Sequence, residues 1–154
     1  MKIRTGVPGD LAIIADFNIK LALESENLTL DPKVVTAGVA AVLKDRSRGI
    51  YFVAEIDGVI AGQLMITYEW SDWRNGNIWW IQSVYVAEAH RGAGVFKALF
   101  RHVEMLARES REVCSLRLYM EKHNERARRA YEKLGMKEMH YDVLEFSIAG
   151  RSGE

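Results

Sequence analysis

The sequence predicts an α/β protein whose helices flank a mixed, mostly antiparallel sheet. Apolar residues recur along the 154 residues at strand spacing in some segments and at helical spacing in others. In addition, residues 78–86 predict a strand, residues 92–109 an amphipathic helix and residues 114–120 a second strand, and such a crossover makes the two strands parallel. No repeat, low-complexity segment or linker divides the chain, so we expect one domain over residues 1–154.

The N-terminal elements are expected to be a short strand and two helices. Residues 2–5 predict the strand, and a Pro-Gly-Asp turn at residues 8–10 follows it. The first helix is indicated by apolar residues at helical spacing, namely Leu11, Ile14, Ala15, Ile19 and Ala22. Asp31 and Pro32 fit an N-cap followed by proline at the first helical position, which opens a second helix through about Lys44.

The middle of the chain predicts three strands. In the segment IYFVAEIDGVIAGQLMITYEW, two β-rich runs flank Asp57 and Gly58, a two-residue turn that suits a hairpin. The third run, residues 78–86, follows an Asn-Gly turn signal at residues 75–76. Its aromatic and β-branched residues predict a strand that is largely buried on both faces.

The C-terminal third continues the alternation of helix and strand. The segment CSLRLYM predicts a strand that buries the single cysteine, Cys114. Residues 124–134 predict a short helix that ends at Gly135, because glycine commonly follows a helix C-terminus. The tail, residues 137–148, alternates enough in hydropathy to predict one or two closing strands.

Composition excludes several classes of protein. Lys and Arg total 21 and Asp and Glu total 21, so the formal net charge is zero, whereas proteins that coat nucleic acids or bind anionic membranes carry a basic excess. No stretch approaches the roughly 18 apolar residues of a membrane span. Cys114 has no Cys or His neighbours at metal-ligand spacing, so no metal site is expected. We therefore expect a cytoplasmic protein with neither a membrane nor a nucleic-acid partner.

An Arg-Gly-x-Gly turn stands where the strand of residues 78–86 meets the following helix. A helix N-terminus exposes backbone N–H groups, Gly92 and Gly94 leave that backbone open to an anion, and Arg91 adds positive charge, so the turn favours a phosphate or diphosphate. A Walker A loop is excluded because Lys97 is followed by alanine, and a dinucleotide fingerprint is excluded because Lys97 replaces its third glycine. A glycine-rich turn without a ligand remains the alternative.

A second motif lies in NERARRAYEKLGM, residues 124–136. Asn124 and Tyr131 are seven residues apart, close to two helical turns, so they share a helix face with Ala127 between them. Ala127 leaves room for another group to pack against the helix. The Tyr131 hydroxyl can donate a proton to a thiolate or alkoxide, although Tyr131 taken alone fits a core aromatic better.

The two motifs, in this order and separation, resemble the GCN5-related N-acetyltransferase (GNAT) family. The resemblance covers nearly the whole chain in element order, and its specific residues lie between Val84 and Met136. It implies a parallel pair of central strands that splays at a bulge, where main-chain groups bond the arm of coenzyme A, and a turn that holds the diphosphate. It also implies that Tyr131 protonates the departing thiolate. The implied coenzyme-binding residues are Val84, Tyr85, Val86, Arg91, Gly92, Ala93, Gly94, Val95, Phe96, Asn124 and Ala127.

The implied activity is transfer of an acetyl group from acetyl-CoA to a primary amine of a small molecule or amino-acid-like acceptor. Two features depart from the family pattern. Phe96 stands where Gly or Ala is usual, and residues 78–86 lack the glutamate that serves many members as a base. Glu121 is the first replacement candidate for that base, followed by Glu69 and Glu24, or a water molecule relays the proton.

The acceptor side of the fold is expected to include Glu24, Tyr68 and Glu69, whose acidic members would favour a cationic acceptor. A protein N-terminus or lysine is the alternative acceptor. A non-catalytic acyl-CoA sensor is the alternative from another class, favoured by the missing strand glutamate and opposed by Tyr131. A homodimer is also expected, because dimers are common in this fold.

Overall fold

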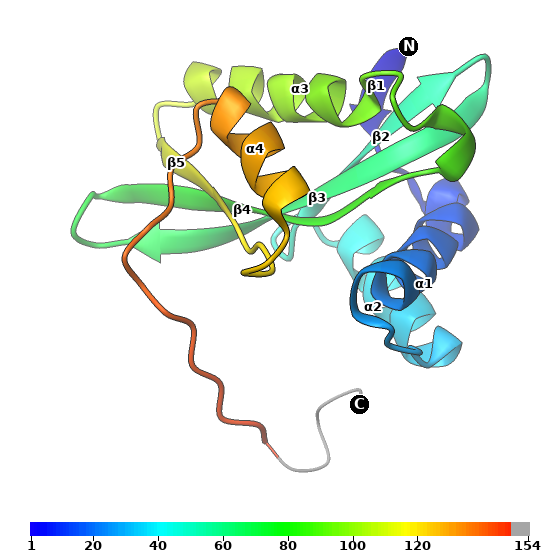
Figure 1. Ribbon diagram of the computed structural model, residues 1–154, viewed down its shortest axis with the longest axis horizontal. Helices are drawn as coiled ribbons and strands as arrows, with labels where there is room; N and C mark the ends of the chain where they lie inside the picture. Colours follow the sequence, from blue (N-terminus) through cyan, green and yellow to red (C-terminus); the bar gives the residue numbers. More distant parts are fainter. Residues whose placement is uncertain (149–154) are drawn as a thin grey trace. The chain divides into compact units, whose positions relative to one another are not determined.

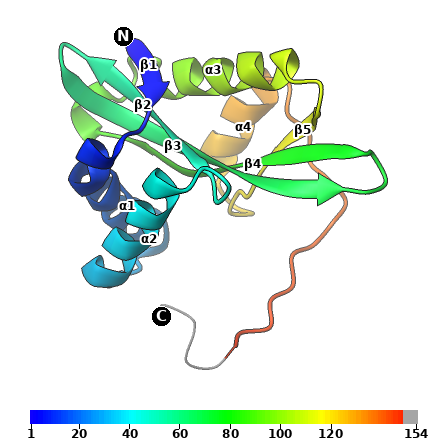
Figure 2. The same ribbon diagram turned by 180° about the vertical axis from the view of Figure 1, so that it is seen from behind.

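The structure is a computed structural model that describes residues 1–148. The chain forms two compact units, the first comprising Met1–Leu118 and the second beginning at Tyr119. In the first unit, two helices cover one face of the sheet and one helix covers the other (Figures 1 and 2). The strands are β1 Lys2–Thr5, β2 Ile50–Ile56, β3 Val59–Ser71, β4 Gly76–Val86 and β5 Val113–Leu118. The helices are α1 Leu11–Glu26, α2 Pro32–Lys44, α3 Val95–Glu109 and α4 Glu125–Lys133, with 3-10 turns η1 Pro8–Asp10 and η2 Glu88–His90.

The strands form one sheet in the order β1-β2-β3-β4-β5. Neighbouring strands from β1 to β4 pair antiparallel, and β4 pairs with β5 parallel. The predicted mixed, mostly antiparallel sheet with one parallel crossover pair is therefore confirmed. Helices α1 and α2 contact the sheet on one face and α3 contacts it on the other (Figure 2).

Local signals set most element boundaries where they were expected. Asp57 and Gly58 have φ angles of 51° and 78°, as a two-residue hairpin turn between β2 and β3 requires. The Asp31 side chain accepts a hydrogen bond from the Lys33 N–H at 2.8 Å and so caps α2. Helix α3 begins at Val95, three residues later than predicted, because Gly92 and Gly94 adopt positive φ angles that no α-helix contains.

Each face of the sheet has its own core. Ile14 and Val39 come from α1 and α2 and pack with Tyr51 and Val53 of β2. On α3, Leu99 and the neighbouring apolar residues of its inner face are buried. Burial of these side chains provides the main free energy that fixes α1 and α3 against the sheet.

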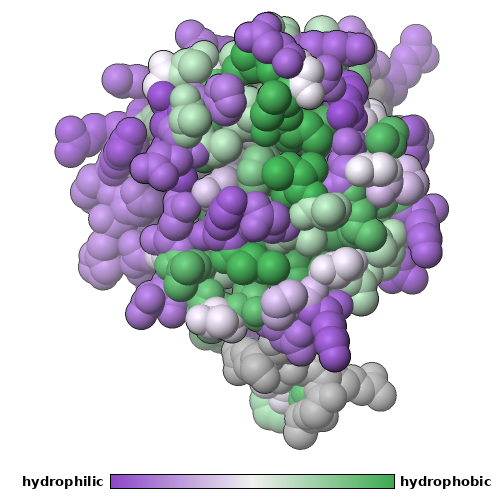
Figure 3. Space-filling model, turned by 90° about the vertical axis from the view of Figure 1, so that its right-hand side faces the viewer, coloured by the Kyte–Doolittle hydropathy of each residue, from purple (hydrophilic) through white to green (hydrophobic). Residues whose placement is uncertain are grey.

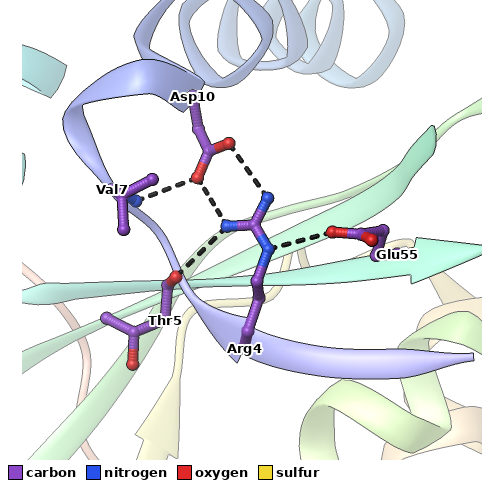
Figure 4. A network of polar contacts seen from close by, with 5 residues as sticks. All are labelled: Arg4, Thr5, Val7, Asp10 and Glu55. Carbon is purple, nitrogen blue, oxygen red and sulfur yellow. Dashed lines mark hydrogen bonds and ion pairs between the residues drawn. The ribbon is translucent and has the colours of Figure 1, made fainter. Parts of the chain in front are cut away.

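A polar network ties β1 to the start of α1 (Figure 4). The Arg4 guanidinium donates to both carboxylate oxygens of Asp10, at 2.7 and 3.1 Å, and its Nε donates to Glu55 Oε2 at 3.0 Å. The Val7 N–H also donates to Asp10, at 2.9 Å. The hydrogen bonds from Arg4 outweigh burial and hold the pKa of Asp10 below its ordinary value. The network therefore fixes the turn that leads into α1.

Two C-terminal predictions are wrong. Cys114 is exposed, because β5 is an edge strand of the sheet, and its thiol lies 3.4 Å from the Asn77 carbonyl oxygen. Residues 137–148 contain no strand, and Leu144 and Phe146 are 94% and 88% exposed. A strand needs a hydrogen-bonding partner, and residues 119–148 contain α4 but no strand with which the tail pairs.

Candidate functional site

Strand β4 extends beyond the last residue that pairs with β5. Its parallel pairing with β5 stops at Ile81, opposite Leu118, whereas β4 continues to Val86. From Gln82 onwards, β4 is paired in the first unit only with β3. Main-chain N–H and C=O groups on that side of the strand are therefore available to a ligand that lies along it as a further strand would.

A β-bulge lies at the point where the two strands separate. On β3 one residue lies between Gln63 and Met65, but their partners on β4, Tyr85 and Gln82, have two residues between them. Strand β4 thus carries one extra residue, as a bulge requires. Ser83 in the bulge has a φ angle of 52°, a left-handed conformation that is uncommon for serine.

The Arg-Gly-x-Gly turn lies beyond the end of β4. Gly92 and Gly94 have φ angles of 83° and 77°, which L side chains rarely adopt. A Cβ added at either glycine would meet no described atom within 4 Å, so the space beside the turn is open. Gly94 is the N-cap of α3 and supplies no side chain to cap it. The first turn of a 15-residue helix, with its positive dipole end, therefore faces open space.

Gly62 of β3 lets the end of β4 and the start of α3 come together. A Cβ at this position would lie 2.8 Å from the Tyr85 carbonyl oxygen and 2.8 Å from Cγ1 of Val95. Val95 is the first residue of α3 and is buried. The absence of a side chain at Gly62 therefore sets where α3 begins relative to the bulged strand. The Phe96 side chain is partly buried, and its ring centroid lies 6.1 Å from that of Phe100.

Arg91 is held between β4 and α1. Its Nε donates to the Val86 carbonyl oxygen at 3.1 Å, and its Nη2 donates to Glu24 Oε2 at 2.6 Å. The guanidinium also lies over the Tyr85 ring, 5.6 Å from the centroid. The Tyr85 hydroxyl donates to the other Glu24 oxygen at 2.8 Å. The turn and the last turn of α1 are thus joined through one carboxylate.

These contacts decide what Glu24 can do. The hydrogen bond from Tyr85, followed by the hydrogen bond from Arg91, lowers the pKa of the Glu24 carboxyl. Burial, followed by the hydrogen bond to Glu24, raises the pKa of the Tyr85 hydroxyl. Glu24 is therefore a stabilised carboxylate with both oxygens engaged, which makes it the weakest of the three acidic candidates for a general base.

The other two acceptor-side candidates lie on β3. The Tyr68 hydroxyl donates to the Arg46 carbonyl oxygen at 2.9 Å, and burial raises the pKa of this hydroxyl. Glu69 accepts a hydrogen bond from Trp80 Nε1 at 3.3 Å and lies 3.7 Å from Nη1 of Arg117. Within residues 1–148, no hydrogen bond or ion pair joins Glu24 to Tyr68 or Glu69, so the structure does not bring the three into contact.

The second unit holds the remaining predicted residues. Strand β5 ends at Leu118, so Glu121 lies in the loop before α4, not at a strand end as predicted, and its Oε2 accepts from the His123 N–H at 2.8 Å. Asn124 caps α4 by accepting from the Ala127 N–H at 3.0 Å. Tyr131 lies on α4, which ends at Lys133, and Gly135 follows the helix with a φ angle of 90°. The predicted helix and its glycine stop are confirmed.

Sequence reasoning missed Gln63, Asn18 and Tyr51. Gln63 is fully buried and donates to Asn18 Oδ1 at 2.9 Å and to the Ser83 carbonyl oxygen at 3.3 Å. Asn18 in turn donates to the Tyr51 hydroxyl at 3.0 Å. The available signal was a glutamine within the apolar run of residues 59–67.

Residues 1–148 contain neither a metal-ligand cluster nor a membrane-spanning helix. No group of three or more His, Cys, Asp and Glu side chains there could hold a metal ion. In the same residues, no helix combines the length and apolar character that crossing a membrane requires.

Comparison with known families assigns the chain to a class. Residues 21–136 match the model of the acetyltransferase (GNAT) family, which is more than half of the sequence. The chain belongs to the GNAT acetyltransferase family. No curated protein matches it.

Solved structures agree with that assignment. A possible acetyltransferase from Clostridium difficile 630 shares 43% identity over 96% of this chain and 97% of its own, with a TM-score of 0.91. A probable acetyltransferase shares 23% identity over 98% of this chain and 100% of its own, with a TM-score of 0.84. A ribosomal-protein-alanine N-acetyltransferase from Brucella melitensis biovar Abortus 2308 shares 20% identity over 96% of this chain and 100% of its own, with a TM-score of 0.76. The last two likenesses concern the fold alone.

Proposed function

We propose that this protein transfers an acetyl group from acetyl-CoA to a primary amine of a small molecule or amino-acid-like acceptor. The observation that carries the proposal is the end of β4, from Gln82 to Val86, which has no partner on the β5 side and is followed, after η2, by an open, glycine-rich helix start. A strand edge and a helix N-terminus in sequence suit a ligand with an amide-containing arm and a diphosphate, as coenzyme A has.

The residues of the first unit fit that ligand. Main-chain groups of Val84, Tyr85 and Val86 would bond the arm, since β5 no longer pairs with β4 there. Backbone N–H groups of the turn and first turn of α3 would receive the diphosphate, and the open space beside Gly92 and Gly94 accommodates it. Arg91 contributes positive charge at the same turn.

When bound, acetyl-CoA supplies an acetyl thioester as the acyl donor. The acceptor ammonium must lose a proton before its nitrogen can attack, so a base or a water relay is needed. We propose Glu121 for that role, followed by Glu69. Glu24 is the weakest candidate because both of its carboxylate oxygens are engaged by Tyr85 and Arg91. Tyr131 is proposed as the acid that protonates the thiolate, on the strength of the family pattern in residues 124–131.

The acceptor is proposed to be cationic and to lie near Glu24, Tyr68 and Glu69. A protein acceptor is the alternative, and one solved relative with the same fold is named for acetylating a ribosomal-protein alanine. A non-catalytic acyl-CoA sensor is the second alternative, since no carboxylate stands on β4.

The domain and its assembly are also proposals. The family match runs across the boundary between the two units at residues 118 and 119, which supports one acetyltransferase domain over residues 1–154. A cytoplasmic location and a homodimer are proposed as well. The side where α1 and α2 lie shows apolar side chains between hydrophilic ones (Figure 3). Exposed apolar residues on or beside these helices are Val7, Leu23, Leu28 and Val34. Sedimentation of the purified protein would test for a dimer.

Thiol release tests the proposed reaction. The protein is incubated with acetyl-CoA and a panel of small amines, amino acids and peptides while free thiol is measured. We expect release that depends on one class of amine. Tight binding of CoA without release for any amine would favour the sensor, and release only with peptides would favour the protein acceptor.

A further inference from the structure

Gln63 is the one fully buried glutamine side chain among the residues that the structure describes, and its hydrogen bonding is incomplete. It lies in β3 at 0% exposure, directly opposite Tyr85 of β4. Its Nε2 donates to Asn18 Oδ1 and to the Ser83 carbonyl oxygen, but its Oε1 is buried without a hydrogen-bond partner. A buried amide with an unmet acceptor lowers stability relative to an apolar side chain of similar shape. Stability therefore does not explain why a glutamine stands here.

The partners of Gln63 point to the bulge in β4. Ser83 is held through its carbonyl oxygen, which accepts a hydrogen bond from Gln63 Nε2 at 3.3 Å. The Tyr51 hydroxyl accepts a hydrogen bond from Asn18, so a chain of hydrogen bonds connects α1, β2, β3 and β4. Among the buried side-chain nitrogen and oxygen atoms of residues 1–148, Gln63 Oε1 is the one without a hydrogen-bond partner.

Ser83 is the unusual residue that this network surrounds. Within residues 1–148, the other non-glycine residues with positive φ are Asn27, Asp57 and Asn75, all of types that tolerate the left-handed region and all located at a helix end or a turn. Ser83 alone among them lies within a strand. A strained conformation persists only where its surroundings hold it, and the hydrogen bond from Gln63 to the Ser83 carbonyl oxygen contributes to that restraint.

We propose that Gln63 is a positioning residue that holds the β4 bulge in the conformation required for coenzyme A binding. This inference rests on the proposed function. Main-chain groups of a strand point alternately to its two sides, so the extra residue at the bulge decides which groups of Val84 to Val86 face the open side. Loss of the restraint lets the strand relax toward a regular register, in which the opposite set of groups faces the ligand.

The test is the variant Gln63→Met, which keeps the size of the side chain and removes its hydrogen bonds. The dissociation constant for CoA is measured by calorimetry, and KM for acetyl-CoA and kcat follow from thiol release. We expect the dissociation constant and KM to rise by about tenfold with a smaller change in kcat, as for a misplaced binding group. The control Val39→Ala truncates a buried α2 residue in the same core without touching the bulge, and it should bind CoA as the wild type does.

A second substitution separates positioning from general destabilisation. Glycine adopts positive φ freely, so the double variant Gln63→Met/Ser83→Gly should recover most of the lost affinity. If Gln63→Met does not fold, Asn18→Ala tests the same contact. It removes the α1 partner of the Gln63 amide and should also weaken CoA binding. Unchanged CoA binding in Gln63→Met, equal weakening by Val39→Ala, or no recovery with Ser83→Gly would overturn the inference. A wild-type protein that does not bind CoA would instead overturn the proposed function.

Discussion

Glu24 and Arg91, 67 residues apart in the sequence, form an ion pair with 2.6 Å between Oε2 and Nη2. The pair joins the last turn of α1, on the proposed acceptor side, to the proposed diphosphate turn. Both side chains are nearly half exposed, so the pair contributes little to stability. Its main effect is electrostatic, because one carboxylate offsets the charge that an incoming diphosphate would meet.

Removing the cation should weaken coenzyme binding. In Arg91→Ala we expect the dissociation constant for CoA to rise by about tenfold, because a charge-assisted contact to the diphosphate is lost. The difference from the wild type should shrink as salt is added, since exposed charges are screened. Titration calorimetry at low and high salt measures this. Arg101→Ala on α3, which removes another ion-paired and half-exposed arginine, should leave binding unchanged.

Removing the negative charge of Glu24 should have the opposite effect on CoA binding. Glu24→Gln keeps an acceptor for the Tyr85 hydroxyl but removes the charge that offsets Arg91. We expect CoA to bind about twofold to fivefold more tightly at low salt, as the loss of one exposed charge allows. In the same variant, KM for a cationic acceptor should rise if Glu24 contacts it. Weaker CoA binding would show instead that Glu24 is needed to orient Arg91.

Gly62 gives a steric prediction. In Gly62→Ala the new Cβ would lie 2.8 Å from a backbone oxygen of β4 and 2.8 Å from Val95, so α3 must shift. We expect a loss of about 1–3 kcal/mol in the free energy of unfolding, together with weaker CoA binding. Urea denaturation and calorimetry measure the two effects. Gly38→Ala in α2 is the matched control, because its Cβ meets nothing within 4 Å and alanine favours a helix.

The Arg4–Asp10 pair predicts how stability depends on pH. The folded-state pKa of Asp10 lies below its ordinary value of 3.8, so its contribution is present above about pH 4 and is lost as the pH falls through the folded-state value. Hydrogen bonds to a charged group suggest a contribution of about 1–3 kcal/mol. Urea denaturation at pH 7 and pH 3 should show this loss in the wild type and a smaller loss in Asp10→Asn. An equal loss in both would assign the effect to other carboxylates.

The comparison of sequence with structure separates local from distant causes. The Asp57–Gly58 turn, the Asp31 cap and the Gly135 stop depend on the conformations of one to four residues, and all three were predicted. The ion pair between Glu24 and Arg91 depends on how α1 packs against β4, which no local pattern contains. The glycines at the start of α3 were recognised, but their positive φ angles, which delay the helix to Val95, were not.

The features that the sequence did not predict also depend on residues that are distant in the sequence. Gln63 is a polar residue in an apolar strand, but its partners Asn18 and Ser83 come from α1 and β4, so its role required the fold. The tail alternates in hydropathy as strands do, yet alternation shows which face a strand would bury and not whether a partner strand exists. Cys114 lies in such an alternating run and is exposed because its strand is at the edge of the sheet.

Tyr131 provides the sharpest test of the proposed chemistry. If its hydroxyl protonates the thiolate, Tyr131→Phe removes a proton donor that matters only during the reaction, so kcat should fall by about 100-fold or more while the dissociation constant for CoA changes little. Thiol release and calorimetry measure the two quantities. Tyr141→Phe removes the hydroxyl of an exposed tyrosine in the same unit and should leave both unchanged. Equal losses of affinity and turnover in Tyr131→Phe would make the tyrosine structural, and the proton would then have to come from another group or from water.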